Sequence, residues 1–294
     1  MLGEALTAIV TPFKTDGTID FERFGELALY LVENGSDGIV VAGTTGESPT
    51  LTDDERLELF RVAVDTLGGR ATVIAGTGTY STAHSVHLTR EAHELGVDGL
   101  LVVTPYYNKP PARGIVEHFR AIADVSDKPI IVYNIPGRVA VNIEPETIVE
   151  LAEIPSVRAV KQANDDLVQA RRIVSETDLT LYAGDDILIL PFLELGGIGG
   201  ICVHTHVVGP QVKRMIRSFH EGDLETARQI DQDLQPAYEL LQVQVNPIAI
   251  KAALSLLGHG VGGLRLPLVE ANEGEVTLIR DCLERLGVLS VAPV

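Results

Sequence analysis

The sequence predicts an α/β protein that folds as a TIM (β/α)8 barrel with additional C-terminal helices. Eight short apolar runs, rich in β-branched residues, each precede a longer segment with helical spacing of apolar residues. Continuously apolar strands are typical of a parallel sheet that is buried on both faces. The stretch "GTGTYS" (76–81) has only two of the three glycines of a dinucleotide-binding fingerprint. Eight such units without that fingerprint favour a closed barrel over a doubly wound sheet.

The expected elements alternate along the chain. The strands are 6–13, 38–43, 72–78, 99–105, 129–134, 157–162, 179–184 and 200–203. The clearest helices between them are 21–33, 53–67, 82–95 and 113–125. Thr52 is a suitable N-cap for the second helix, and Asp53 and Glu55 place negative charge in its first turn.

Further helical patterns follow the last strand, at 208–222, 223–241 and 246–258, and no Gly/Ser linker separates them from it. We therefore expect a barrel core over 1–206 and C-terminal helices over 207–294 that pack on it as one structural unit.

Composition excludes several functional classes. The 294 residues are 45% hydrophobic and 22% charged, as in soluble globular proteins. The net charge of −18 repels phosphate backbones and argues against nucleic-acid binding. No apolar run approaches the about 20 residues of a membrane span, and the N-terminus lacks the pattern of a signal peptide, so we expect a cytoplasmic protein. Cys202 and Cys282 lie far apart and indicate neither a disulfide framework nor a zinc finger.

Reactive side chains gather at the C-terminal ends of the expected strands, where barrel active sites form. Lys161 interrupts the apolar run "VRAVKQAND", where a charged ammonium is costly. Burial favours the neutral amine, which can attack a carbonyl and form a Schiff base. Tyr133, Tyr106 and Tyr107 lie at neighbouring strand ends, and a tyrosine can relay the protons that this chemistry moves. The alternatives are a lysine that reaches solvent and tyrosines that serve as core residues.

Two features suit carboxylate binding. The loop "GTTGES" (43–48) offers backbone N–H groups and the hydroxyls of Thr44 and Thr45. An ordinary loop between a strand and a helix, with no binding role, is the alternative. Arg138, a few residues beyond Tyr133, could hold a second carboxylate in a bidentate manner, or could be a surface arginine.

His204 and His206 are two residues apart, so on a strand they would share a face and could ligate a metal. Because the sequence offers no evident third ligand nearby, we expect no metal and no cofactor, and favour packing or hydrogen-bonding roles for both.

A series of motifs extends from Thr7 to Leu268: "TPF", "GTTGESPTL", "VIAGTG", "VVTPYYNKP", "YNIPGR", "VK", "GDD", "NPI", "KAAL" and "LRLPL". It closely resembles the dihydrodipicolinate synthase (4-hydroxy-tetrahydrodipicolinate synthase) family of the pyruvate-dependent class I aldolases, a superfamily that includes N-acetylneuraminate lyase. The resemblance implies a metal-independent lyase that condenses pyruvate with L-aspartate 4-semialdehyde, a step of diaminopimelate and lysine biosynthesis.

The main alternative is a 2-keto-3-deoxy-sugar-acid aldolase, which would keep Lys161 and Tyr133 without needing Arg138. A keto-acid sensor is disfavoured because a binder needs no proton relay. A metal-dependent aldolase is disfavoured for want of ligands.

The resemblance also implies roles for single residues. Lys161 would form the imine with pyruvate. Tyr133, Thr44 and Tyr107 would relay protons, with Tyr107 supplied by a neighbouring subunit of a homo-oligomer that is expected to be a dimer of dimers (a homotetramer). Thr45 would bind the carboxylate of pyruvate.

Arg138 would bind the carboxylate of aspartate semialdehyde, and the backbone carbonyls of Gly184 and Ile201 would line the site. The sequence differs from the usual pattern at Gln162 and Asn164, directly beside the lysine.

Lysine-regulated relatives bind their effector in a cleft that includes Ser48 and Tyr106. There they carry His, Asn and Glu at the positions of Arg56, Tyr80 and His84. The exchange removes an anion and adds a cation, so weak or absent inhibition by lysine is expected.

Overall fold

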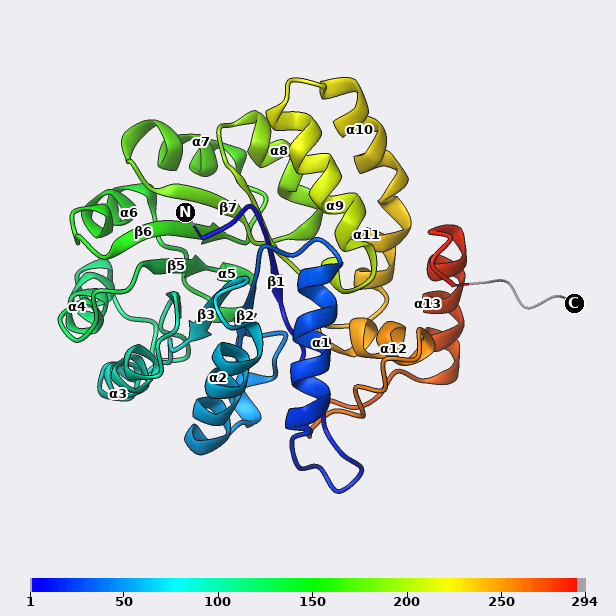
Figure 1. Cartoon of the computed structure of the whole chain (residues 1–294). Coiled ribbons are helices and arrows are strands. Elements are labelled where there is room, and N and C mark those ends of the chain that lie inside the picture. Colours follow the sequence, from blue (N-terminus) through cyan, green and yellow to red (C-terminus); the bar gives the residue numbers. More distant parts are fainter. Residues whose placement is uncertain (1, 290–294) are drawn as a thin grey trace, which may run out of the picture.

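The computed structural model describes residues 2–289, and eight parallel strands form a closed barrel surrounded by helices (Figure 1). Each strand pairs with its sequence neighbours, and β8 closes the barrel on β1. The predicted fold class is confirmed. The strands are β1 (Ala5–Ala8), β2 (Gly38–Val41), β3 (Thr72–Gly76), β4 (Gly99–Val103), β5 (Ile130–Asn134), β6 (Val157–Gln162), β7 (Thr180–Ala183) and β8 (Gly199–Cys202).

Helices connect the strands on the outside of the barrel. These are α1 (Phe21–Glu33), α2 (Asp53–Leu67), α3 (Thr82–Glu94), α4 (Ala112–Ala123), α5 (Pro136–Val139), α6 (Pro145–Ala152), α7 (Leu167–Glu176) and α8 (Ile189–Glu194). Short 3-10 turns η1 (Ser48–Thr50) and η2 (Asp186–Leu188) follow β2 and β7. The expected start of α2 is present as a capping box: the Glu55 N–H donates to Thr52 Oγ1, and the Thr52 N–H donates to Glu55 Oε2.

The first strand is shorter than the apolar run that predicted it. β1 ends at Ala8, whereas the run continues to Phe13. Pro12 has no N–H to donate to a sheet, and Thr11 donates its hydroxyl to the Gly46 carbonyl in the neighbouring loop. The remainder of the run therefore forms part of the barrel mouth.

Alternate strand residues point to two separate apolar layers. The outer layer packs between the sheet and the helices. The inner layer fills the barrel with Leu6, Ala8, Val40, Ile74, Leu101, Ile131, Tyr133, Ala159, Tyr182 and Ile201.

Five helices follow β8: α9 (Thr205–His220), α10 (Leu224–Asp233), α11 (Gln235–Gln242), α12 (Ile248–Leu256) and α13 (Glu273–Arg285). They gather on one side of the barrel, where α9 contacts α1 and α12 packs against α13 (Figure 1). α13 has no counterpart among the helical patterns expected from the sequence. The expected division between 206 and 207 falls within α9. Of the helices in the described part of the chain, none has the length and apolar character needed to cross a membrane.

Candidate active site

Lys161 and Tyr133 are neighbours across the β5–β6 pair, near the C-terminal ends of both strands. Only 5% of Lys161 and 4% of Tyr133 is exposed. The Lys161 ammonium nitrogen lies 4.3 Å from the centroid of the Tyr133 ring. The Tyr133 carbonyl accepts hydrogen bonds from the N–H and the hydroxyl of Thr104, both at 3.0 Å. The fold thus brings an amine and a phenol together in the apolar barrel interior.

Gly184 follows β7 and allows the chain to pass closely beside the lysine. Its N–H donates to the Gln162 carbonyl at 2.7 Å. A Cβ at this position would lie 3.0 Å from Lys161 Cγ and 2.7 Å from Ala163 Cβ. A side chain would therefore displace the lysine stem. Ile201, on β8, is buried in the inner layer with Tyr133.

The loop after β2 carries Thr44 and Thr45. Two non-glycine residues of this loop adopt left-handed backbone angles, with φ of 52° at Ala42 and 57° at Glu47. Such angles persist only where surrounding contacts hold them. Thr45 is buried, and its hydroxyl oxygen accepts a hydrogen bond from the Asn246 amide at 2.9 Å. Thr44 is half-buried.

A buried ion pair anchors the same loop to the C-terminal helices. The Lys251 ammonium lies 2.7 Å from Glu47 Oε1, and both side chains are almost fully buried. Lys251 also donates to the Gly263 carbonyl at 2.6 Å, and the Arg265 N–H donates to Glu47 Oε2. Burial lowers the pKa of Lys251, while Glu47 opposes that shift. Sequence reasoning missed this pair; the only signal was that both residues belong to motifs of the resemblance.

A cavity of about 210 Å³ opens at this end of the barrel. That is below the about 300–1,000 Å³ typical of sites for drug-sized ligands, and it suits a small metabolite. Thr44, Tyr133 and Arg138 line it; Lys161 and Thr45 are buried directly beside two of these residues. The full lining is Ala42, Gly43, Thr44, Ser48, Pro49, Arg56, Gly76, Gly78, Leu101, Val103, Tyr106, Tyr133, Ile135, Arg138 and Val139.

The structure separates the two adjacent tyrosines. Tyr106 is half-buried in the cavity wall, and its ring packs edge-on against Tyr80 at 5.4 Å between centroids. Burial raises the pKa of Tyr106, and the nearby Arg56 opposes the shift. Tyr107 is 93% exposed, with a left-handed φ of 67°. Within one chain, Tyr107 is therefore not brought to Tyr133 or Thr44.

Arg138 lies in the short helix α5 and is exposed at the rim of the cavity. Its guanidinium donates to the backbone carbonyl of Asn246 at 3.4 Å. Among the described residues its side chain makes only this hydrogen bond, so its other guanidinium N–H groups are available to a ligand.

Gln162 points away from Lys161, because successive strand residues face opposite sides. It joins a network of amide side chains outside the barrel: it accepts from Asn134 and donates to Asn164 and Gln169. Gln162 and Asn164, which depart from the usual pattern, therefore belong to a hydrogen-bond network on the side of β5 and β6 that faces away from Lys161.

His204 and His206 lack the shared face that a strand would give them, because β8 ends at Cys202 and His206 lies in α9. His206 Nδ1 donates to the Val203 carbonyl at 2.7 Å, and its Nε2 accepts from the Val10 N–H. Burial lowers the pKa of His206 to about 4, so the ring is neutral and fills a hydrogen-bonding role.

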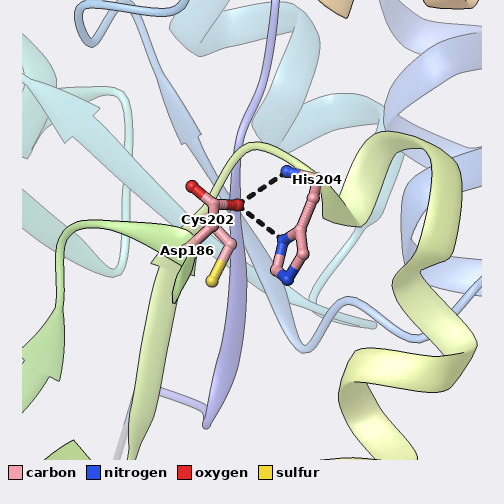
Figure 2. A group of neighbouring side chains, drawn as sticks. All are labelled: Asp186, Cys202 and His204. Atoms are coloured by element: carbon pink, nitrogen blue, oxygen red, sulfur yellow. Dashed lines mark hydrogen bonds and ion pairs between the residues drawn. The ribbon is translucent and has the colours of Figure 1, made fainter. Parts of the chain in front are cut away.

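His204 instead faces Asp186, with Cys202 alongside (Figure 2). His204 Nδ1 lies 2.6 Å from Asp186 Oδ1, which also accepts the N–H groups of Val203 and His204. Ligands of a tetrahedral zinc ion, with bonds near 2.0 Å, stand about 3.3 Å apart, so this spacing is that of a direct Asp–His contact and not of two zinc ligands. Burial alone would raise the pKa of Asp186, but His204 and the two N–H groups outweigh burial and lower it.

Comparison with known proteins places this arrangement in a family. The family model described as the dihydrodipicolinate synthetase family matches residues 1–286. The chain is 49% identical over 288 residues to the 4-hydroxy-tetrahydrodipicolinate synthase of Heliobacterium modesticaldum, covering 97% of this chain and 96% of that protein.

Solved structures agree. The dihydrodipicolinate synthase of Cyanidioschyzon merolae, crystallised with lysine bound, matches with a TM-score of 0.96 and 46% identity, over 98% of this chain and 99% of that one. The chloride-inhibited enzyme of Acinetobacter baumannii in complex with pyruvate matches with a TM-score of 0.95 and 33% identity, over 98% of this chain and 100% of that one.

Proposed function

The chain belongs to the dihydrodipicolinate synthetase family, and we propose that it condenses pyruvate with L-aspartate 4-semialdehyde to give 4-hydroxy-tetrahydrodipicolinate. This is the activity named for its relatives, and it would supply diaminopimelate and lysine biosynthesis. The observation that carries the proposal is the buried Lys161 amine beside the Tyr133 phenol.

The first step is attack of the neutral Lys161 amine on the keto carbon of pyruvate. The carbinolamine that forms loses water and becomes a protonated imine, so that the lysine nitrogen carries the former keto carbon. Loss of a methyl proton gives an enamine, whose terminal carbon adds to the aldehyde carbon of the second substrate. The aldehyde oxygen takes up a proton, and ring closure through the substrate amine releases the lysine.

The proton transfers need a group beside the lysine that can both give and take a proton. Tyr133 has this position, and Thr44, which lines the same cavity, extends the chain of hydroxyls. We assign the third member of the relay to Tyr107 of the partner subunit. The near-complete exposure of Tyr107 in a single chain supports a residue that is used across an interface.

Two carboxylates must be bound, one from each substrate. We assign that of pyruvate to Thr45 and the loop N–H groups, and that of the aldehyde to Arg138 at the rim. The carbonyls of Gly184 and Ile201 would line the floor near the imine. The assembly we propose is a homotetramer built from two such dimers, acting in the cytoplasm.

Borohydride trapping tests the chemistry directly. Reduction in the presence of pyruvate should attach one group per chain, and peptide mapping should place it on Lys161, because only an imine is trapped. Lys161→Ala should abolish the label, whereas Lys14→Ala, at an exposed position, should retain it. A label on another lysine would contradict the mechanism.

A coupled assay at fixed pyruvate then tests the second substrate. Aspartate semialdehyde should be consumed much faster than sugar-derived aldehydes. The opposite order would assign the chain to the 2-keto-3-deoxy-sugar-acid aldolases.

A further inference from the structure

Asn246 contacts both of the side chains to which we assign substrate carboxylates. Its side-chain amide donates to the Thr45 hydroxyl oxygen at 2.9 Å, and its backbone carbonyl accepts from the Arg138 guanidinium at 3.4 Å. It lies between α11 and α12, about 200 residues from Thr45 in sequence. One residue of the C-terminal region therefore connects the loop after β2 with Arg138 at the rim of the cavity.

The segment that carries Asn246 is firmly held. Pro247 precedes α12, and one turn further on Lys251 forms its buried ion pair with Glu47. Glu47 and Thr45 belong to the same loop. The Lys251–Glu47 ion pair therefore holds the segment that carries Asn246 against the loop that carries Thr45.

A hydroxyl group has one proton and can accept two further hydrogen bonds. Because the Asn246 amide donates to Thr45, the proton of Thr45 must point elsewhere. Among the described residues, the Thr45 hydroxyl donates to no protein acceptor, and the buried Asn246 Oδ1 has no hydrogen-bond partner. The orientation of the amide therefore leaves the Thr45 proton free to be donated to a further acceptor.

We propose that Asn246 is a positioning residue that fixes the Thr45 hydroxyl as a hydrogen-bond donor to the carboxylate of the keto acid. The proposal rests on the function proposed above and goes further, since it makes the C-terminal region responsible for keto-acid affinity. Asn246 does not touch the reacting atoms; it acts through the direction of one proton. Its backbone carbonyl also restrains Arg138, but that contact does not depend on the side chain.

The test uses Asn246→Asp, which keeps the shape of the side chain and exchanges a donor for an acceptor. The new carboxylate would accept the Thr45 proton and would repel the substrate carboxylate. Half-maximal borohydride trapping should then require at least about tenfold more pyruvate than in the wild type. This is the loss of affinity expected for one hydrogen bond to a charged group. Trapping at saturating pyruvate should stay complete, because Lys161 is unchanged.

Two comparisons exclude a merely structural effect. Asn246→Ala frees the Thr45 hydroxyl to rotate, so the required pyruvate concentration should rise less than in Asn246→Asp. The matched control is Gln242→Glu, which adds the same charge at an exposed position of the preceding helix and should bind pyruvate as the wild type does. The half-saturating concentration of the aldehyde should change less than that of pyruvate in every variant, because the Arg138 contact is to the backbone.

A pH series and a second background sharpen the result. As the pH falls, the introduced carboxyl becomes protonated and can donate to Thr45, so the defect of Asn246→Asp should shrink. In a Thr45→Val background, Asn246→Ala should add little further loss, because the hydroxyl through which Asn246 acts is gone.

Wild-type pyruvate affinity in Asn246→Asp, or an equal loss from Asn246→Ala with and without Thr45→Val, would overturn the proposal. Failure of the wild type to be trapped at any pyruvate concentration would instead refute the proposed function.

Discussion

Two lysines are buried in this protein, and their surroundings differ in kind. Lys251 lies 2.7 Å from Glu47 and donates to a backbone carbonyl, so its charge is compensated. Lys161 faces the ring of Tyr133, and among the described residues no carboxylate lies within ion-pair distance of it. A buried cation with an anionic partner is costly to unpair, whereas a buried amine without one is available for chemistry.

The largest effect is expected when the Lys161 amine itself is removed. Lys161→Met should lower kcat by more than about a thousandfold, since no other group forms the imine. The melting temperature should stay unchanged or rise, because no charge partner is left unpaired. Thermal denaturation beside the coupled assay would check both; a fall of many degrees would mean that Lys161 also has a structural role.

Removing the other lysine should have the opposite profile. Lys251→Met leaves Glu47 buried without its cation, which should cost about 3–5 kcal/mol in the free energy of unfolding. Denaturant titration would measure this. The pyruvate concentration for half-maximal trapping should also rise, because the loop that carries Thr45 loses its anchor.

The control for that experiment is the double variant Glu47→Leu/Lys251→Met, which should recover much of the lost stability. An equal loss in the double variant would show that the cost does not come from an unpaired charge.

The proton relay proposed beside the buried amine is complete only if a second chain supplies Tyr107. Tyr107→Phe and Lys161→Ala, each poorly active alone, should regain activity when mixed subunits exchange. With random exchange of equal amounts within dimers, about one quarter of the sites would carry both native residues. The coupled assay measures the recovery. Proven heterodimers without recovery would indicate that Tyr107 serves its own chain or neither.

The smallest expected effect concerns lysine as a ligand. Arg56 is buried with its guanidinium on the Ser48 carbonyl at 2.6 Å, and His84 lies 2.8 Å from Asp53. Asp53 is thus already paired with His84, and the Arg56 cation lines the cavity. In contrast to the lysine-bound relative from Cyanidioschyzon merolae, L-lysine at about 1 mM, an ordinary small-ligand concentration, should inhibit initial rates by less than half. Half-inhibition below that concentration would contradict this expectation.

Much of the barrel was predictable because its signals are local. Apolar runs with flanking helical patterns depend on residues close in sequence, and so does the position of Lys161 at the end of one run. The residue roles carried by the resemblance stay predictions. The structure brings Thr44, Tyr133 and Arg138 to one cavity, with Lys161 beside Tyr133, and leaves Tyr107 exposed.

Local spacing did not determine where some side chains point. Two histidines at positions i and i+2 share a face only on a strand, and β8 ends before them. Gln162 was adjacent to the lysine in sequence but opposite to it in space, because side chains alternate along a strand.

By itself, the sequence determined the barrel, the family it resembles and the lysine within it, since each is encoded by neighbouring residues. Only the tertiary structure decided which distant groups meet: Glu47 with Lys251, and Thr45 with Asn246. The physical reason is that a buried charge or amide takes its partner from whichever segment packs against it. No period or spacing along the chain encodes a partner some 200 residues away.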